Sequence, residues 1–202
     1  TYKNAKIINC DISSEMLKQN LNNRRWFFSY KPTLIQCNAE RIPIHDNSVD
    51  MIFCNQLMAW INNIEVFYDE IKRVLKNEGI FIFSTLGSYN FTPNLNIDHT
   101  ITLYNYPDIQ DLGDTLIKAG FKDPVLDVDQ IFINYSSKRK LHNDLKNCGA
   151  INKGSNLLNM LNHEKNNISL ELIYGHAWNQ DKKSKSTEQY IDIKSIKNVS
   201  TK

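Results

Sequence analysis

The chain has 202 residues, the size of one domain or of one domain with a tail. Hydrophobic residues make up 41% and charged residues 23%, which excludes fully disordered, collagen-like and membrane-embedded classes. The formal net charge is +2, so no global basic field supports a nucleic-acid or membrane-surface role. No apolar run approaches the length of a membrane-spanning helix.

The start of the chain and its cysteines bear on its cellular setting. The sequence begins at Thr1 rather than Met and shows no apolar leader, so we expect a cytoplasmic protein that is a fragment or a processed product. Cys10, Cys37, Cys54 and Cys148 show no CxxC spacing, and we expect them to be reduced, partly buried thiols. Cysteine and histidine are too scattered to predict a metal site.

The first half of the chain alternates short apolar runs with helical repeats. Strands are predicted at Ala5–Cys10, Thr33–Cys37, Val49–Cys54 and Ile80–Thr85. Helices are predicted from Ser13 or Ser14 to Leu21, and from Ile64 to Leu75 with Gly79 as the C-terminal stop. The last strand is apolar on both faces, as in the middle of a parallel sheet covered by helices. The class is therefore α/β with right-handed crossovers.

The second half adds further elements and a tail. An irregular stretch over 86–106 precedes a predicted helix over 108–119, with Gly120 just past its end. There follow two strands or one bulged strand (124–129 and 131–135), an amphipathic helix (138–147), a short helix around Leu157 and an antiparallel strand (168–175). We expect one domain over 1–179 and a disordered tail over 180–202.

Asp11 is the strongest local signal for chemistry. An acidic side chain at the end of a strand in a nucleotide-binding unit can accept hydrogen bonds from both ribose hydroxyls of an adenosine cofactor. A carboxylate suits that task because it offers two acceptor oxygens to two donors. Asp11 could equally cap the helix that follows it, and spacing alone does not separate the two readings.

Two other polar segments follow predicted strands. The segment Asn38–Pro43 could bring a polar side chain to an adenine amino group, or it could be a plain turn. Asn55 ends the third strand, at the edge where open α/β sheets bind ligands, although it could simply terminate the strand. Met58 and Trp60 follow it and are expected in the core or in a pocket wall.

Four segments resemble the motifs of class I S-adenosylmethionine-dependent methyltransferases. Asp11–Leu17 is similar to D-x-S-x-x-M-L, and Asn38–Pro43 is similar to D-A-E-x-L-P. Asp46–Ile52 is similar to N-S-F-D-x-V, and Arg73–Gly79 is similar to R-V-L-K-P-G-G. The resemblance implies a Rossmann-like sheet with helices on both faces and S-adenosyl-L-methionine as the cofactor.

The C-terminal half narrows the resemblance. Tyr106–Asp114, Ala119–Asp127, Leu145–Ala150 and Tyr174–Trp178 resemble the malonyl-acyl-carrier-protein O-methyltransferases of biotin synthesis. The implied reaction is methyl transfer to the free carboxylate of a malonyl thioester on acyl-carrier protein, which would be the partner. The stretch 86–106 would form part of a substrate lid. A mitochondrial complex I assembly factor proposed to hydroxylate an arginine shares part of the pattern.

The resemblance also implies roles for matching residues. The residues implied to contact the cofactor are Asp11, Ile12, Met16, Asn38, Ala39, Asn55 and Gln56. Asp11 would hold the ribose, Asn38 and Ala39 would bracket the adenine, and Asn55 and Gln56 would line the pocket near the methionine part. No catalytic residue is expected, because a carboxylate is already nucleophilic at neutral pH and in-line positioning supplies most of the acceleration.

The glycines mark a departure from this family. All seven lie at Gly79 or later, so the family's first strand and glycine-rich loop are absent. That loop lets backbone approach the cofactor, so we expect little or no binding by this chain alone. The first strand is central in the family, and its loss is expected to expose apolar edges on Ala5–Cys10 and Val49–Cys54. A missing N-terminal segment or a separate polypeptide would supply it, or the protein is a decaying member of the family.

Two further departures from the family concern the binding of the cofactor and of the substrate. They leave rival functions open. Asn38 replaces the usual Asp, which weakens the adenine contact because only one side-chain oxygen remains. No Arg or Lys lies between Lys76 and Lys118 to pair with a malonyl carboxylate. The rivals are another methyltransferase, a hydroxylase-like assembly factor, and a non-catalytic carrier-protein-binding remnant.

Overall fold

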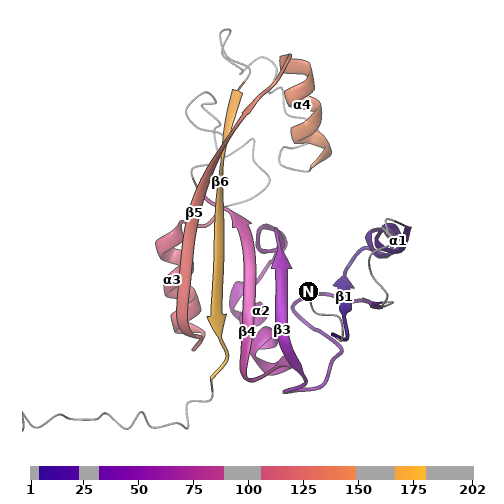
Figure 1. The fold of residues 1–202 in the computed structure, drawn as a ribbon, viewed down its shortest axis with the longest axis vertical. Helices are drawn as coiled ribbons and strands as arrows, with labels where there is room; N and C mark the ends of the chain where they lie inside the picture. Colours follow the sequence, from indigo (N-terminus) through magenta and orange to yellow (C-terminus); the bar gives the residue numbers. More distant parts are fainter. Residues whose placement is uncertain (1–4, 23–31, 89–105, 149–166, 181–202) are drawn as a thin grey trace, which may run out of the picture.

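A computed structural model describes residues 5–22, 32–88, 106–148 and 167–180. Within these ranges the chain forms a two-stranded sheet and a four-stranded sheet (Figure 1). The helix expected around Leu157, most of the stretch 86–106 and the tail after residue 180 lie outside the described residues. Among the helices of the described ranges, none combines the length and apolar character of a membrane span.

The smaller sheet is built by β1 (Ile8–Asp11) and β2 (Thr33–Gln36), with α1 (Ser14–Asn22) packed against both. The two strands are parallel, and their ladder continues past β2, because the backbone N–H of Cys37 donates to the carbonyl of Asp11 at 3.1 Å. The predicted strand, helix and strand of this segment are confirmed.

The larger sheet has the strand order β3-β4-β6-β5. β3 (Val49–Asn55) runs parallel to β4 (Leu75–Leu86), whereas β6 (Asn167–Trp178) is antiparallel to both β4 and β5 (Lys122–Asn134). The two runs predicted in the β5 region form one strand, with a register shift between Lys122 and Val125. The antiparallel placement of β6 is also confirmed.

Helices α2 (Ile64–Val74) and α3 (Ile109–Lys118) lie on one face of this sheet (Figure 1). Their apolar sides meet the sheet in a core whose largest members are aromatic: Phe67, Tyr68, Phe81, Phe83 and Phe121. The rings of Tyr68 and Phe121 meet edge-on with centroids 5.7 Å apart, a favourable arrangement for aromatic pairs. β5 and β6 extend beyond β3 and β4, and α4 (Lys138–Asn147) lies beside that extension (Figure 1).

The end of α2 was predicted to within one residue, but the stop signal assigned to Gly79 is wrong. Gly79 was expected to stop the helix, but the helix ends at Val74 and the backbone of Leu75 is already extended, with φ −67° and ψ 137°. β4 therefore begins earlier than predicted. Gly79 is needed for space instead, because a Cβ there would lie 2.8 Å from the carbonyl oxygen of Lys76. At the end of α3, Gly120 has φ 82°, so the prediction of a glycine stop is correct there.

The facing edges of the two sheets have no strand partner among the described residues. β1 pairs only with β2, and β3 pairs only with β4. Ile8 on β1 is 41% exposed and Phe53 on β3 is 65% exposed. The prediction of two open apolar edges on these strands is thus confirmed for the described part of the chain.

Candidate functional site

The candidate site lies where β1, β2 and β3 end. β1 and β2 are parallel, β3 and β4 are parallel, and the arrows of β1 and β3 point the same way in Figure 1. The carboxyl ends of these strands therefore lie on one side of the molecule. Asp11, Asn38 and Asn55 stand at or just after three of these ends. Ligands of open α/β sheets bind at such an edge.

Asp11 is the last residue of β1, and its carboxylate shapes the turn into α1. One oxygen, Oδ1, accepts a hydrogen bond from the backbone N–H of Ser13 at 2.8 Å. The first turn of α1 is capped by Ser13 instead, whose hydroxyl accepts from the N–H of Met16 at 3.3 Å. The reading of Asp11 as the helix cap is therefore wrong, and its second carboxylate oxygen is not used by the turn.

Ile12 and Met16 lie on the surface beside Asp11. Ile12 is 70% exposed and Met16 is 55% exposed. The backbone carbonyl of Ile12 accepts a hydrogen bond from the side-chain amide of Gln36 at 3.1 Å, which fixes this turn to the end of β2. Exposed apolar side chains next to a carboxylate can pack against an adenosine ring system. Gln36 was not identified from the sequence, since its contact depends on strand register.

Asn38 begins a tight turn after β2. Its side-chain oxygen accepts from the N–H of Glu40 at 2.9 Å, and its backbone carbonyl accepts from the N–H of Arg41 at 3.0 Å. Ala39, in the same turn, packs against the hydrophobic core and anchors the turn there. The turn reading of this segment is thus correct, and the side-chain nitrogen of Asn38 remains available as a donor.

Glu40 ties this turn to the segment before α2. Its carboxylate oxygen Oε1 accepts from the backbone N–H groups of Asn62 and Asn63, at 2.9 and 2.8 Å. Asn63 in turn caps α2, because its side-chain oxygen accepts from the N–H groups at positions 65 and 66. The acidic residue of the Asn38–Pro43 motif therefore has a structural task, which is to hold the turn at the start of α2.

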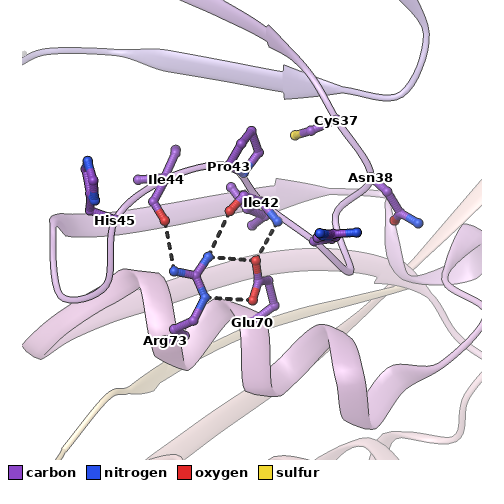
Figure 2. A pocket seen from close by; sticks show the side chains of 9 residues that line it. Cys37, Asn38, Ile42, Pro43, Ile44, His45, Glu70 and Arg73 are labelled. Carbon is purple, nitrogen blue, oxygen red and sulfur yellow. Dashed lines mark hydrogen bonds and ion pairs between the residues drawn. The ribbon is translucent and has the colours of Figure 1, made fainter.

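A pocket of about 710 Å³ lies between this loop and α2 (Figure 2). Cys37 and Asn38 line one side of it, and Glu70 and Arg73 of α2 line the other. Arg73 donates to the backbone carbonyls of Ile42 and Ile44 and to the Glu70 carboxylate. Its hydrogen bonds raise the pKa of Arg73, and Arg73 lowers the pKa of Glu70 by hydrogen bonding. Arg73 and Glu70 therefore hold the loop in place. Their hydrogen-bonding groups are taken up by contacts within the protein rather than left for a ligand.

Asn55 is the last residue of β3, Gln56 follows it, and both contact β4. The hydroxyl of Ser84 donates to the side-chain oxygen of Asn55, and the side-chain amide of Gln56 donates to the same hydroxyl at 3.4 Å. Gln56 has φ 55°, a left-handed conformation unusual for a residue other than glycine. Such strained backbone gathers at functional sites. Ser84 orients both side chains and was missed in the sequence, where nothing marked it.

A second pocket, of about 410 Å³, opens beside Asn55 on the sheet face opposite α2. Strand register places Asn55, Ser84, Tyr174 and Asp127 in one row across all four strands. All four line this pocket, together with His176 and Phe53. Tyr174, Asp127 and His176 were noted in the sequence only as parts of family motifs and not as site residues, because only the pairing of β6 with β4 and β5 brings them to Asn55.

The described residues fit the adenosine half of S-adenosylmethionine. Asp11 offers an acceptor oxygen at the end of β1, and Asn38 offers an amide donor at the end of β2. For the methionine half, the described residues offer Asn55 and Gln56 at the end of β3. Asn55 and Asn38 line different pockets, and Asp11 lines neither, so the two pockets do not by themselves define one continuous cofactor cleft.

Comparison with known proteins identifies the family. Residues 1–83 match the model of a methyltransferase domain family. The malonyl-[acyl-carrier protein] O-methyltransferase of Gallionella capsiferriformans is 31% identical over 202 residues, covering 88% of this chain and 70% of that protein. The chain belongs to the malonyl-[acyl-carrier protein] O-methyltransferase family. The enzyme of that name from a Methylovorus species is also 31% identical, and 68% of its length is covered.

The fold of this methyltransferase agrees with that assignment. The crystal structure of the YcgJ protein from Bacillus subtilis superimposes with a TM-score of 0.62 at 15% identity, covering 87% of this chain and 83% of that one. The class I methyltransferase fold predicted from the motifs is confirmed. The chain is accordingly an S-adenosylmethionine-dependent methyltransferase by family.

Proposed function

We propose that this methyltransferase esterifies the free carboxylate of a malonyl group carried on acyl-carrier protein. The observation that carries the proposal is the 31% identity to enzymes named for that reaction, over 88% of the chain. The similarity spans both halves, so it includes the C-terminal segments that distinguish this family from other methyltransferases.

The site residues have defined tasks under this proposal. S-adenosylmethionine supplies an electrophilic methyl group when it is bound. The free oxygen of Asp11 accepts from the ribose, and the turn at Asn38 and Ala39 borders the adenine. Asn55 and Gln56, held by Ser84, border the methionine end. The chain has to position the acceptor carboxylate and exclude water, because that carboxylate needs no general base.

Methylation of purified malonyl-acyl-carrier protein tests the proposal. Intact-mass analysis should show the addition of one methyl group in the presence of S-adenosylmethionine. Acetyl-acyl-carrier protein, which has no free carboxylate, is the matched substrate control and should remain unmodified. Equal modification of both carriers, or no modification of the malonyl carrier, would refute the malonyl assignment and favour another acceptor or a non-catalytic role.

An Asp11→Asn variant tests the cofactor part separately. Loss of a charge-assisted hydrogen bond of about 1.5–3 kcal/mol should weaken S-adenosylhomocysteine binding by about 10- to 100-fold in calorimetry. Glu15→Gln is the matched control, since the Glu15 carboxylate lies nearby on α1 but pairs with Lys18 on the surface. Equal affinities for the two variants would show that Asp11 does not hold the ribose.

A further inference from the structure

Cys10 and Cys37 lie side by side at the ends of β1 and β2. Register pairs Cys10 with Ile35, so Cys37, two residues further along, faces the same side of the sheet as Cys10. The hydrogen bond from the N–H of Cys37 to the carbonyl of Asp11 keeps the two chain segments aligned at this point. Neither cysteine is in a disulfide; Cys10 is exposed and Cys37 is partly exposed.

The two cysteines directly precede two residues of the candidate cofactor site. Cys10 directly precedes Asp11, and Cys37 directly precedes Asn38. These are the residues that hold the adenosine under the proposed function. A covalent bond between the two sulfurs would therefore join the two segments on which cofactor binding depends.

We propose that Cys10 and Cys37 form a reversible disulfide on exposure to a hydroperoxide, and that this bond weakens binding at the adjacent adenosine site. The first part stands on the two cysteines alone, whereas the second part rests on the proposed function.

The chemistry needs one hydroperoxide for each disulfide. The sulfur of Cys37 attacks a peroxide oxygen and breaks the O–O bond, giving a sulfenic acid at Cys37 and one water from hydrogen peroxide. The Cys10 thiol then loses its proton, and its sulfur attacks the Cys37 sulfur. The S–S bond forms, and the departing hydroxide takes a proton to give a second water. Two thiols are oxidised and one peroxide is reduced.

The surroundings of the cysteines favour this order of events. Burial and the neighbouring Cys37 thiol raise the pKa of Cys10 to about 12, so Cys10 remains protonated at neutral pH and serves as the second, resolving thiol. Burial also raises the pKa of Cys54 to about 12 and keeps that thiol from competing. Cys148 follows α4 and is exposed, far along the chain from the pair.

Closing the disulfide has to move the turn at Asn38. On parallel strands about 4.8 Å apart with a rise of about 3.3 Å per residue, diagonal positions two residues out of register have Cα atoms about 8 Å apart, whereas disulfides hold Cα atoms at about 4.4–6.8 Å. The bond therefore draws Cys37 toward β1. Because the neighbouring turn is fixed by the hydrogen bonds of Asn38, this shift disturbs the adenine side of the site.

Peptide mapping tests the crosslink directly. The full chain is treated with hydrogen peroxide, its remaining thiols are alkylated, and it is digested with trypsin without reductant. The expected product links peptide 7–18, which carries Cys10, to peptide 26–41, which carries Cys37. Dithiothreitol should separate them. Cys148→Ser should form the same crosslink, and Cys37→Ser should not. A crosslink of Cys10 to Cys54, or isolated sulfinic acids without a crosslink, would overturn the proposal.

Calorimetry with S-adenosylhomocysteine tests the effect on binding. The oxidised protein should bind at least about tenfold more weakly than the reduced protein, and Cys37→Ser should bind equally under both conditions. Unchanged affinity in a crosslinked protein would overturn the regulatory part. If the reduced protein fails to bind, the proposed function fails for this chain and the regulatory part fails with it, while the peptide map still decides the disulfide.

Discussion

The guanidinium of Arg73 donates two hydrogen bonds to the carboxylate of Glu70, at 2.8 and 2.7 Å, from the next turn of α2. Its remaining donors reach the carbonyls of Ile42 and Ile44 and the carboxylate of Asp46. One side chain thus fixes the loop after β2 to the helix that covers β4. The position of the segment 42–46 therefore depends on a residue far away in the sequence.

Arg73→Lys should destabilise the protein although it retains the charge. Lysine cannot form the forked hydrogen bonds to a carboxylate and two carbonyls, so we expect a loss of about 2 kcal/mol in the free energy of unfolding. The side chain of Arg73 is 33% exposed, so most of this loss comes from hydrogen bonds rather than charge. Urea denaturation measures it. Arg41→Lys, also on the pocket rim, should change stability by less than about 0.5 kcal/mol.

Stability should fall at acidic pH partly through Glu70. Hydrogen bonding from Arg73 lowers the pKa of Glu70 below its ordinary value of 4.5. The stabilisation is therefore fully present well above pH 4.5 and is lost as the pH falls through the lowered pKa of the folded state. Urea denaturation between pH 7 and pH 3 should give a shallower decline for Glu70→Gln, because the amide has no proton to take up on unfolding. Glu65→Gln, at the start of the same helix, should follow the wild-type profile.

Asn179 fastens the last turn of α2 to the start of β4. Its side-chain amide donates to the carbonyls of Lys72 and Leu75, both at 3.0 Å, and of Lys76 at 3.3 Å. Asn179→Asp should cost about 2–4 kcal/mol, because a carboxylate would face three carbonyls without a proton to donate. Chemical denaturation at pH 7 measures this loss, and Asn134→Asp on exposed β5 is the matched control. A similar effect of both changes would refute this role for Asn179.

Replacing either of two glycines by alanine should change the stability of the protein, in opposite directions at the two positions. A Cβ at Gly175 would overlap the ring of Phe83 and lie 2.6 Å from Leu126, so Gly175→Ala should destabilise by about 1–3 kcal/mol. In α3, a Cβ at Gly113 would meet only Leu126 at 3.3 Å, so Gly113→Ala should be neutral or stabilise by up to about 1 kcal/mol.

A double-mutant cycle locates the cause of the Gly175 effect. Phe83→Leu removes the ring that a Cβ at Gly175 would overlap, so the double variant should be less destabilised than the sum of the two single changes. Thermal denaturation of the four proteins supplies the cycle. Strict additivity would mean that the loss arises in the backbone rather than in contact with the ring.

Much of the fold could be predicted from local patterns. The bounds of the helix over 138–147 were predicted as they stand, and the helix over 109–118 was predicted to within one residue at each end. These helices carry their own signals, since Asp108 and Ser137 accept backbone N–H groups at their starts. The role of Gly79 as the stop of α2 was wrong because β4 begins at Leu75, where it pairs with β3, before the glycine is reached.

The candidate site, like the fold, has features that the sequence predicts and features that it does not. The sequence by itself determined the polar residues at three strand ends, Asp11, Asn38 and Asn55, because a strand's end and its turn residues are local properties. The tertiary structure alone decided what lies around these residues: Ser84 at Asn55, Gln36 beside Asp11, and Cys37 on the same side of the sheet as Cys10. Those contacts follow from the register of strands distant in sequence, which pairing and packing fix together.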